Sequence, residues 1–378
     1  MTKEVYITET NCITPLGFDV ATNVNNISSG VSGIQLHDNG MMDKPFYAAI
    51  INEVKLNDAF AKISSSQNYT RLEKMMILAM QPIVEKAKLD LNEKTGFILS
   101  TTKGNVTALA NSTQENFEKA HLHHLAKRVA TFFGFKAEPI VVSNACVSGV
   151  LAVSIAKRLI QSDLYDNVFV VAGDEVSEFV LSGFNSFQAM SDLPCKPYSN
   201  NRTGVSLGEA TAAVLVTSDN KNAKVKIVGD GSINDANHIS GPSRTGEGLF
   251  RSIESAMKEA NVKATQIDYI SAHGTATPFN DEMEAIAFNR LELQNVSMNS
   301  LKGFYGHTLG ASGLLETVIG IESVLQNKLY KSLGSDELGV SQNIAIITEN
   351  EEKEIHYFLK TASGFGGCNT AVLFEKAN

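Results

Sequence analysis

The sequence lacks the features that mark membrane, zinc-binding and nucleic-acid-binding proteins. No apolar run is long enough to cross a bilayer, and no apolar core of a signal peptide follows the first residues. The formal net charge is −9, so there is no basic excess to neutralise nucleic-acid phosphates. The four cysteines are far apart and form no Cys-x-x-Cys pair; they are Cys12, Cys146, Cys195 and Cys368. We therefore expect a cytoplasmic protein with reduced thiols, no membrane span and no nucleic-acid partner.

The composition that remains is that of a compact folded protein. The 378 residues are 43% hydrophobic and 19% charged, which excludes a disordered chain and allows a large core. Apolar runs typical of buried strands alternate with helical patterns, which indicates an α/β protein. Strands are predicted at Val5–Thr8, Thr95–Ser100, Asn167–Gly173 and Thr211–Thr217, and helices at Val20–Ile27, Leu72–Ala87 and Asn111–Phe133.

Later segments of the sequence repeat earlier ones in the same order. The similar pairs are Val5–Thr8 with Lys224–Gly229, Val147–Leu151 with Ala311–Leu315, and Ala213–Val216 with Ala371–Phe374. Three ordered similarities predict two related halves, divided near Asp219–Ala223.

One cysteine lies where a predicted strand gives way to a helix. The β-branched run ending at Val142 is followed by small residues, and from Val147 apolar residues recur at three- and four-residue steps. Cys146 is therefore predicted at a helix N-terminus, where free N–H groups and the helix dipole lower the pKa of a thiol. The alternative is an inert cysteine that fills space in the core.

Two histidines of the second half occupy comparable positions. His273 follows the predicted strand Ile267–Ser271, and His307 lies in a glycine-rich loop before the second-half helix. Imidazoles can hold charge and move protons beside a thiolate nucleophile at neutral pH. The turn Ser363–Gly367 could offer backbone N–H groups to an oxyanion. The alternatives are hydrogen-bonded structural histidines and a plain turn between strands.

Together these motifs resemble those of the β-ketoacyl-(acyl carrier protein) synthases of the thiolase superfamily, over nearly the whole chain. The main motifs are Asn144-Ala145-Cys146-Val147-Ser148-Gly149, His273-Gly274-Thr275-Ala276-Thr277-Pro278 with Asp281 and Glu284, Lys302 with Gly306-His307, and Gly364-Phe365-Gly366-Gly367. Further matches are Pro197-Tyr198, Arg202, Gly204, Gly208-Glu209, and Asp235-Ala236-Asn237-His238 before Pro242. The resemblance implies a thiolase-like duplicated fold of two related βαβ halves in an α-β-α-β-α arrangement. Residues 1–220 would carry the nucleophile and cap insertions, and residues 221–378 the two histidines.

The resemblance also implies a reaction in fatty acid or polyketide/polyene biosynthesis. Cys146 would accept an acyl chain from a carrier-protein thioester. Malonyl-acyl carrier protein would lose CO₂, and its carbanion would attack the Cys146 thioester in a Claisen condensation, giving 3-oxoacyl-acyl carrier protein. By the same resemblance, His273 and His307 stabilise the enolate, and Lys302 orients and tunes His307.

The resemblance assigns supporting roles to several further residues. They are Phe365, with Cys146, for the oxyanion hole and the gate; Glu284 and Asp281 behind the histidines; and Thr275 and Thr277 for the phosphopantetheine arm. That arm, carried by acyl carrier protein, is the expected substrate carrier. No tightly bound cofactor and no metal are expected.

The two histidines distinguish this sequence from related classes. Priming synthases pair the cysteine with one histidine and one asparagine. Thiolases need a second late cysteine, as Cys368 could be, but the loop bearing His273 is of the synthase type. Chain-length factors lack the nucleophile, so Cys146 argues against that role. A non-condensing, chain-length-factor-like subunit in a heterodimer remains the alternative.

Two departures from the family pattern lie near the expected acyl pocket. Ser363 stands where a phenylalanine is common, and Met190–Arg202 is shorter than in elongating enzymes of fatty acid synthesis. A polyene or other polyketide-like substrate is therefore our hypothesis.

The expected partners are acyl carrier protein and a second synthase subunit. Carrier proteins are acidic, so docking is expected at a local basic patch, for which the alternative is a solvated helix face. The candidate docking residues are Arg71, Lys74, Lys127 and Arg128. The resemblance implies a dimer formed through a sheet edge in the nucleophile half, either a homodimer or a heterodimer with a related subunit.

Overall fold

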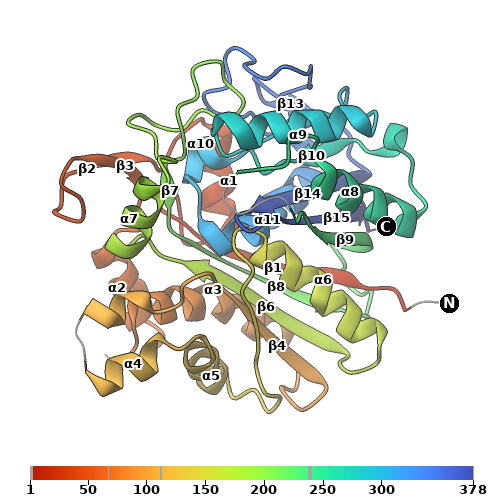
Figure 1. Ribbon diagram of the computed structural model, residues 1–378. Helices are drawn as coiled ribbons and strands as arrows, with labels where there is room; N and C mark the ends of the chain where they lie inside the picture. Colours follow the sequence, from red (N-terminus) through yellow and green to blue (C-terminus); the bar gives the residue numbers. More distant parts are fainter. Residues whose placement is uncertain (1–2, 67, 111–112, 237–240, 378) are drawn as a thin grey trace.

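The computed structural model describes residues 3–66, 68–110, 113–236 and 241–377. The motif residues Asn237 and His238 lie outside these ranges. Within them, ten strands form one sheet in the order β11-β10-β14-β15-β9-β1-β8-β6-β4-β5 (Figure 1). Five strands come from the first part of the chain: β1 Tyr6–Ile13, β4 Thr95–Ser100, β5 Ile140–Val142, β6 Asn167–Asp174 and β8 Ala210–Thr217. Five come from the second part: β9 Val225–Asn234, β10 Tyr269–Ser271, β11 Ser297–Asn299, β14 Tyr357–Gly364 and β15 Cys368–Lys376.

The strand order of the first five strands is repeated by the second five. The order β5-β4-β6-β8-β1 corresponds to β11-β10-β14-β15-β9 when both are read from the outer edge. In each set the outer two pairings are parallel and the inner two are antiparallel. The two sets meet where β1 pairs with β9 at Tyr6–Lys226 and Ile7–Val225. The chain passes from one set to the other between Thr217 and Val225.

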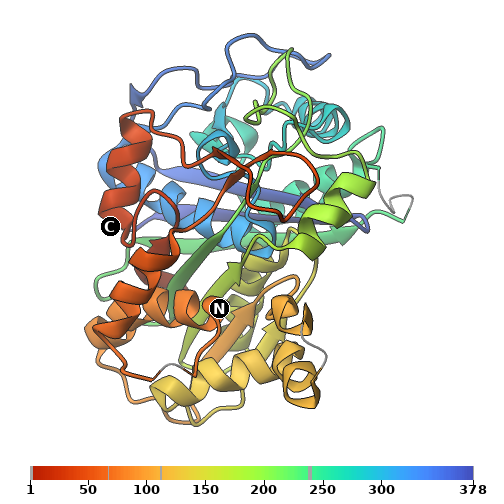
Figure 2. The ribbon, with the colours of Figure 1, turned by 90° about the vertical axis from the view of Figure 1, so that its left-hand side faces the viewer.

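Helices cover the strands in layers. Helices α6 Ser148–Gln161 and α11 Ser312–Gln326 lie between the two sets of strands and share one apolar core with both. Helices α3 Arg71–Ala87 and α5 Leu122–Phe133 pack on the outer face of the first set. Helices α8 Glu247–Ala260 and α9 Pro278–Arg290 cover the second set. This is the predicted α-β-α-β-α arrangement, and Figure 2 shows the two sets stacked one above the other.

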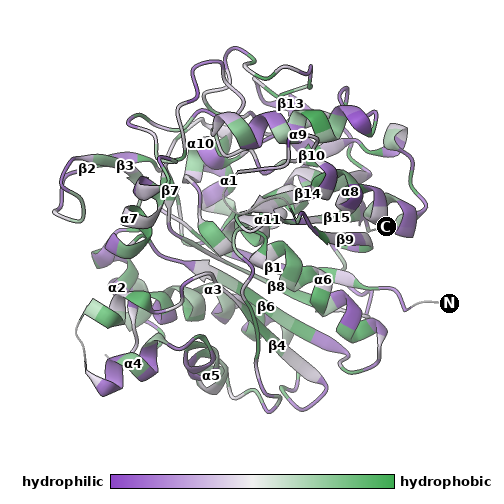
Figure 3. Ribbon diagram, viewed as in Figure 1, coloured by the Kyte–Doolittle hydropathy of each residue, from purple (hydrophilic) through white to green (hydrophobic). Residues whose placement is uncertain are grey.

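The distribution of apolar residues explains why the strands lie between layers of helices. Strand β8 is buried along its whole length, and all but the first residue of β6 are buried. Figure 3 shows hydrophobic residues along β6 and β8, whereas the outer helices α8 and α9 carry many hydrophilic residues. Strands that are apolar on both faces must be covered on both sides, so a layered arrangement follows. Among the described residues, no helix has the length and apolar composition needed to cross a membrane.

The remaining elements are short and lie around this framework. The helices are α1 Val20–Ser28, α2 Glu53–Ala61, α4 Gln114–Ala120, α7 Glu178–Ser186 and α10 Lys302–Tyr305, with 3₁₀ turns η1 Val106–Ala110, η2 Ala264–Gln266 and η3 Leu309–Ala311. The strands are β2 Gln35–His37, β3 Phe46–Ala49, β7 Leu207–Gly208, β12 Lys328–Leu329 and β13 Glu351–Glu352.

The prediction of one long helix ending at Phe133 was wrong. Helices α4 and α5 are separate, because His121 between them has extended backbone (φ −67°, ψ 131°). The side chains of His121 and His123 are exposed and stack on each other, with ring centroids 5.3 Å apart.

Helices α6 and α11 cross at glycines. A Cβ atom on Gly149 would lie 2.7 Å from the carbonyl oxygen of Gly310. A Cβ atom on Gly313 would lie 2.8 Å from the backbone nitrogen of Val150. Only glycine permits this approach, so the two helix N-termini meet closely.

We expect Gly149→Ala and Gly313→Ala each to lower the free energy of unfolding by about 1–3 kcal/mol, because overpacking forces the helices apart. Urea denaturation measures this change. The control is Gly183→Ala on helix α7, where a Cβ atom would have no neighbour within 4 Å. Equal stability of all three variants would show that the two helices do not need this contact.

Candidate active site

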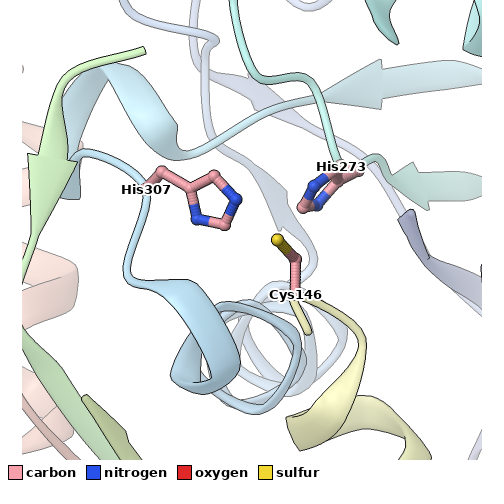
Figure 4. Close-up of side chains that lie close together, drawn as sticks. All are labelled: Cys146, His273 and His307. Atoms are coloured by element: carbon pink, nitrogen blue, oxygen red, sulfur yellow. The ribbon is translucent and has the colours of Figure 1, made fainter. Parts of the chain in front are cut away.

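The structure brings together the three side chains at the centre of the sequence motifs. Cys146 lies just before helix α6, His273 follows strand β10, and His307 lies between α10 and α11 (Figure 4). One ligating atom of each lies within 4.8 Å of the others. The two imidazole rings are nearly perpendicular, with centroids 5.2 Å apart. The exposed fractions are only 6%, 1% and 2%, so water has little access to the three groups.

The three side chains line a cavity of about 440 Å³. Thr275 and Thr277 also line it, and their hydroxyls are hydrogen-bonded to each other at 2.8 Å. Ser363 lines it too, with its hydroxyl donated to Asn369 at 2.8 Å. The other lining residues are mainly small or aromatic, including Phe184, Phe187, Pro242, Phe279, Gly364 and Phe365.

The backbone around Cys146 is held in a sharp bend. Ala145 has a left-handed backbone conformation (φ 44°). The hydroxyl of Ser148 accepts a hydrogen bond from the N–H of Asn144 at 2.7 Å and donates to the carbonyl of Ala145 at 2.6 Å. A Cβ atom on Gly364 would lie 3.0 Å from the nitrogen of Cys146, so the β14–β15 turn approaches the nucleophile closely. The backbone N–H of Phe365 in that turn lies close enough to Cys146 to lower the pKa of its thiol.

Burial raises the pKa of the Cys146 thiol to about 12. The neighbouring Cys368 also raises this pKa, whereas Lys302 and the N–H of Phe365 lower it less. The expectation of a lowered thiol pKa at this helix N-terminus was wrong, because desolvation disfavours the thiolate more strongly than the helix N-terminus favours it. Cys146 therefore rests as a thiol at neutral pH.

Hydrogen bonds to Nδ1 fix the tautomer of both histidines. The Nδ1 atom of His307 accepts a hydrogen bond from the N–H of Leu309 at 3.0 Å. The Nδ1 atom of His273 lies 3.3 Å from the Nζ atom of Lys302, which can only donate. Burial, followed by Lys302, lowers the pKa of both rings, so both are neutral. The proton of each ring therefore lies on Nε2, and the rings act as hydrogen-bond donors.

The same tautomers bear on metal binding. Cys146, His273 and His307 are a set whose atoms are close enough to hold a metal ion. Coordination through Nε2 would move the ring proton to Nδ1, where it would face the N–H of Leu309 or the ammonium of Lys302. These contacts at Nδ1 therefore favour histidine rings that donate through Nε2–H over histidine rings that bind a metal ion through Nε2.

Lys302 contacts His273 and not, as predicted, His307, although its charge does lower the pKa of His307. Its Nζ atom donates to the carbonyl of His273 at 2.6 Å and lies 2.7 Å from Oε1 of Glu316.

Two buried carboxylates hold the loop that carries His273. The carboxylate of Glu284 accepts the N–H of His273 at 2.9 Å and that of Gly274 at 2.7 Å. Asp281 accepts the N–H of Thr275 at 2.9 Å. Burial raises the pKa of Asp281 to about 7.

Three buried charged residues lie beside the site and were not predicted from the sequence: Asp174, Glu316 and Lys360. The carboxylate of Asp174 accepts hydrogen bonds from the N–H groups of Thr102 at 3.0 Å and Gly310 at 2.8 Å, and so ties strand ends to the loop after His307. Each of the three charges lies at the end of, or within, an apolar buried segment. A single charged residue in an otherwise apolar segment is the sequence signal that could have identified each of these three residues.

Aromatic rings surround the entrance to Cys146. The ring centroid of Phe365 lies 5.7 Å from that of Phe184 and 5.5 Å from that of Phe187. Phe184 also lies edge-on to His307, with centroids 6.1 Å apart. Phe365 lies beside the nucleophile, where it was expected, and Phe184 and Phe187 pack against its ring.

The candidate docking residues do not form one basic patch. Arg71 pairs with Glu53 and Glu209 and donates to the carbonyl of Ile51, so its charge is used internally. Lys74 donates to Asn57 at 2.7 Å. Arg128 contacts the carbonyl of Asn68, with its guanidinium 4.6 Å from the ring centroid of Tyr69. Lys127 is exposed. The pairing of Arg71 argues against its expected role in docking.

Known proteins resemble the chain over nearly its whole length. Residues 2–222 match the beta-ketoacyl synthase N-terminal domain, and residues 225–335 match the C-terminal domain. The chain is 27% identical, over 414 residues, to the 3-oxoacyl-[acyl-carrier-protein] synthase 2 of Staphylococcus aureus (strain COL), covering 99% of this chain and 98% of that relative.

Two solved structures share the fold. The ketosynthase ApeO from Xenorhabdus doucetiae, in complex with its chain length factor ApeC, has a TM-score of 0.88 at 23% identity, covering 99% of this chain and 98% of that one. The ishigamide ketosynthase/chain length factor has a TM-score of 0.90 at 19% identity, covering 100% of both chains.

We expect alkylation of Cys146 by iodoacetamide to speed up about tenfold per pH unit up to about pH 10, because the thiolate fraction of a group with a pKa of about 12 rises in this way. Labelling is followed by intact mass. Cys146→Ala is the control for labelling of the other three cysteines. A plateau near neutral pH would instead indicate a thiolate–imidazolium pair.

Proposed function

The chain belongs to the beta-ketoacyl synthase family and is a condensing acyltransferase, and from its site we propose the reaction that it catalyses. The proposed reaction is the decarboxylative Claisen condensation of malonyl-acyl carrier protein with an acyl group held on Cys146. The product is 3-oxoacyl-acyl carrier protein. The observation that carries the proposal is the convergence of one buried thiol with two neutral imidazoles around one cavity.

The first step is transfer of the acyl group to Cys146. The sulfur attacks the carrier thioester, the bond from the acyl carbon to the carrier sulfur breaks, and the thiol proton ends on the departing carrier thiol. Neither imidazole is a ready base for this proton, because both Nδ1 atoms already accept hydrogen bonds. The developing oxyanion is stabilised by the N–H groups of Cys146 and Phe365.

The second step is decarboxylation of the malonyl group. Its thioester oxygen accepts hydrogen bonds from the Nε2–H groups of His273 and His307. The bond to the carboxylate breaks, CO₂ leaves, and the electron pair passes into the enolate. Neutral donors suit this step, because an imidazolium would protonate the carbanion before it could attack the acyl group.

The third step forms the new carbon–carbon bond. The enolate carbon attacks the thioester on Cys146, and the tetrahedral oxyanion again faces the N–H groups of Cys146 and Phe365. Its collapse breaks the carbon–sulfur bond and leaves a Cys146 thiolate, which takes one proton from solvent water to restore the thiol. Thr275 and Thr277 would hold the pantetheine arm, since their hydroxyls line the cavity.

The proposed assembly is a dimer that uses the free edge of strand β5. This strand ends the sheet on the side of the nucleophile half, and Ile140 and Val141 are only partly buried there. Antiparallel pairing with a second β5 or a related subunit would cover that edge. Acyl carrier protein is the proposed partner of the cavity mouth. The ApeO structure contains a ketosynthase with a chain length factor, which supports a heterodimer as one form of this assembly.

The alternative function is that of a non-condensing subunit that shapes a partner's pocket. The free Cys146 thiol in the cavity disfavours it. Incubation with acyl-acyl carrier protein distinguishes the two functions.

We expect incubation with acyl-acyl carrier protein to add one acyl mass to the wild type and none to Cys146→Ala, measured by intact mass. His307→Ala should keep acylation and lose about 100-fold or more in decarboxylation of malonyl-acyl carrier protein. Cys368→Ser is the matched cysteine control and should remain active. A wild type that neither accepts acyl groups nor decarboxylates would leave only the non-condensing role.

Substrate choice is proposed to depend on the space beside Ser363. A phenylalanine there would fill part of the cavity that the small serine leaves open. We expect the wild type to elongate unsaturated or aryl acyl-carrier substrates, and Ser363→Phe to lose about tenfold or more with these while keeping short saturated chains. A wild type confined to saturated chains would refute the polyene or polyketide assignment. The measurement is product analysis with a panel of acyl-carrier proteins.

A further inference from the structure

A second buried lysine stands behind His273. Lys360 lies on strand β14, opposite Ser271 of β10, and is 0% exposed. Its Nζ atom donates to the carbonyls of Ser271 at 3.0 Å and Ala272 at 3.3 Å. These are the two carbonyls immediately before His273. Lys360 also donates to the carbonyl of Thr361 at 2.7 Å.

Lys360 shares its anion with Lys302. One oxygen of Glu316 lies 2.7 Å from Nζ of Lys302, and the other lies 2.7 Å from Nζ of Lys360. The two lysines together donate to the carbonyls of three consecutive residues, from Ser271 to His273. The backbone that carries His273 is therefore fixed by two ammonium groups and one carboxylate.

Two lysines face the single carboxylate of Glu316, and the next carboxylate, Glu284, accepts the N–H of His273. Burial lowers the pKa of Lys360, which the charges of Glu316 and Glu284 oppose. Burying a second cation in this cluster costs stability, so the residue needs a reason. The other titratable groups around His273 are Cys146, His307, Asp281 and Glu284.

We propose that Lys360 is a positioning residue for His273, which holds its backbone and, together with burial and Lys302, keeps its ring a neutral Nε2–H donor during decarboxylation. This inference deepens the proposed function and rests on it. A nearby cation disfavours protonation of the ring, and it also makes the Nε2–H group a stronger donor to an enolate oxygen. Lys360 itself does not line the cavity and touches no substrate.

Two substitutions separate charge from hydrogen bonding. Lys360→Gln keeps an N–H donor for the carbonyls but removes the charge, whereas Lys360→Met removes both. The matched control is Lys157→Met, because Lys157 is also buried and paired with two carboxylates, Asp230 at 3.0 Å and Glu259 at 2.5 Å, away from the site. Thermal denaturation shows whether each variant folds.

The experiment compares the two half-reactions as a function of pH. For Lys360→Met we expect decarboxylation of malonyl-acyl carrier protein to fall about 10- to 100-fold in kcat, with unchanged KM. Acylation of Cys146 should change by less than about threefold. The acidic limb of the decarboxylation profile should move to higher pH in both Lys360 variants, because His273 is protonated more easily without the cation. Lys157→Met should keep the wild-type ratio of the two rates.

The outcomes are distinct. Equal losses in both half-reactions, or an unshifted acidic limb in a folded Lys360→Gln variant, would overturn the inference and leave the proposed function standing. A wild type without decarboxylation would overturn both.

Discussion

The contact between helices α6 and α11 at Gly149 and Gly313 is the constraint on which the site depends. These helices are equivalent in the repeated topology, and each begins just after a residue of the site. Their close approach therefore brings Cys146 and His307 together although they are 161 positions apart in the sequence (307 − 146). The positive ends of both helix dipoles point to the same region, which favours the negative charge that forms on an enolate or a tetrahedral oxyanion.

Buried charges hold this arrangement in place through the backbone. Glu284 binds the N–H groups of the His273 loop, Lys302 and Lys360 bind its carbonyls, and Asp174 binds the N–H of Gly310 after His307. Each charge costs stability when it is desolvated. As a result of these contacts, both imidazoles are held in one orientation and one tautomer before substrate binds. Preorganised donors need no rearrangement at the moment when charge develops.

Much of the fold followed from the sequence, because its signals are local. The strand Thr95–Ser100 was predicted at its observed bounds, since a buried apolar run with turn signals beside it has few alternatives. The ordered repeats agree with the repeated strand order. The break at His121 was missed, because neither glycine nor proline marks it. Its extended backbone ends helix α4 and begins helix α5.

The site was less completely predictable, since its energetics depend on contacts between distant segments. Motifs identified Cys146, His273 and His307, but nothing in the sequence shows that Lys302 lies against His273 instead of His307. The helix position of Cys146 suggested a low thiol pKa, and only the burial seen in the structure reverses that direction. Arg71 looked like a surface charge until its pairing with Glu53 and Glu209 was visible.

The most direct test of the account is the tautomer of the two imidazoles. Nitrogen-15 NMR of enzyme labelled at its eight histidines, with His273→Gln and His307→Gln for assignment, observes it in the resting state. We predict that both rings stay neutral with the proton on Nε2 between about pH 6 and pH 9. An imidazolium signal, or a proton on Nδ1 of either ring in that range, would contradict the account.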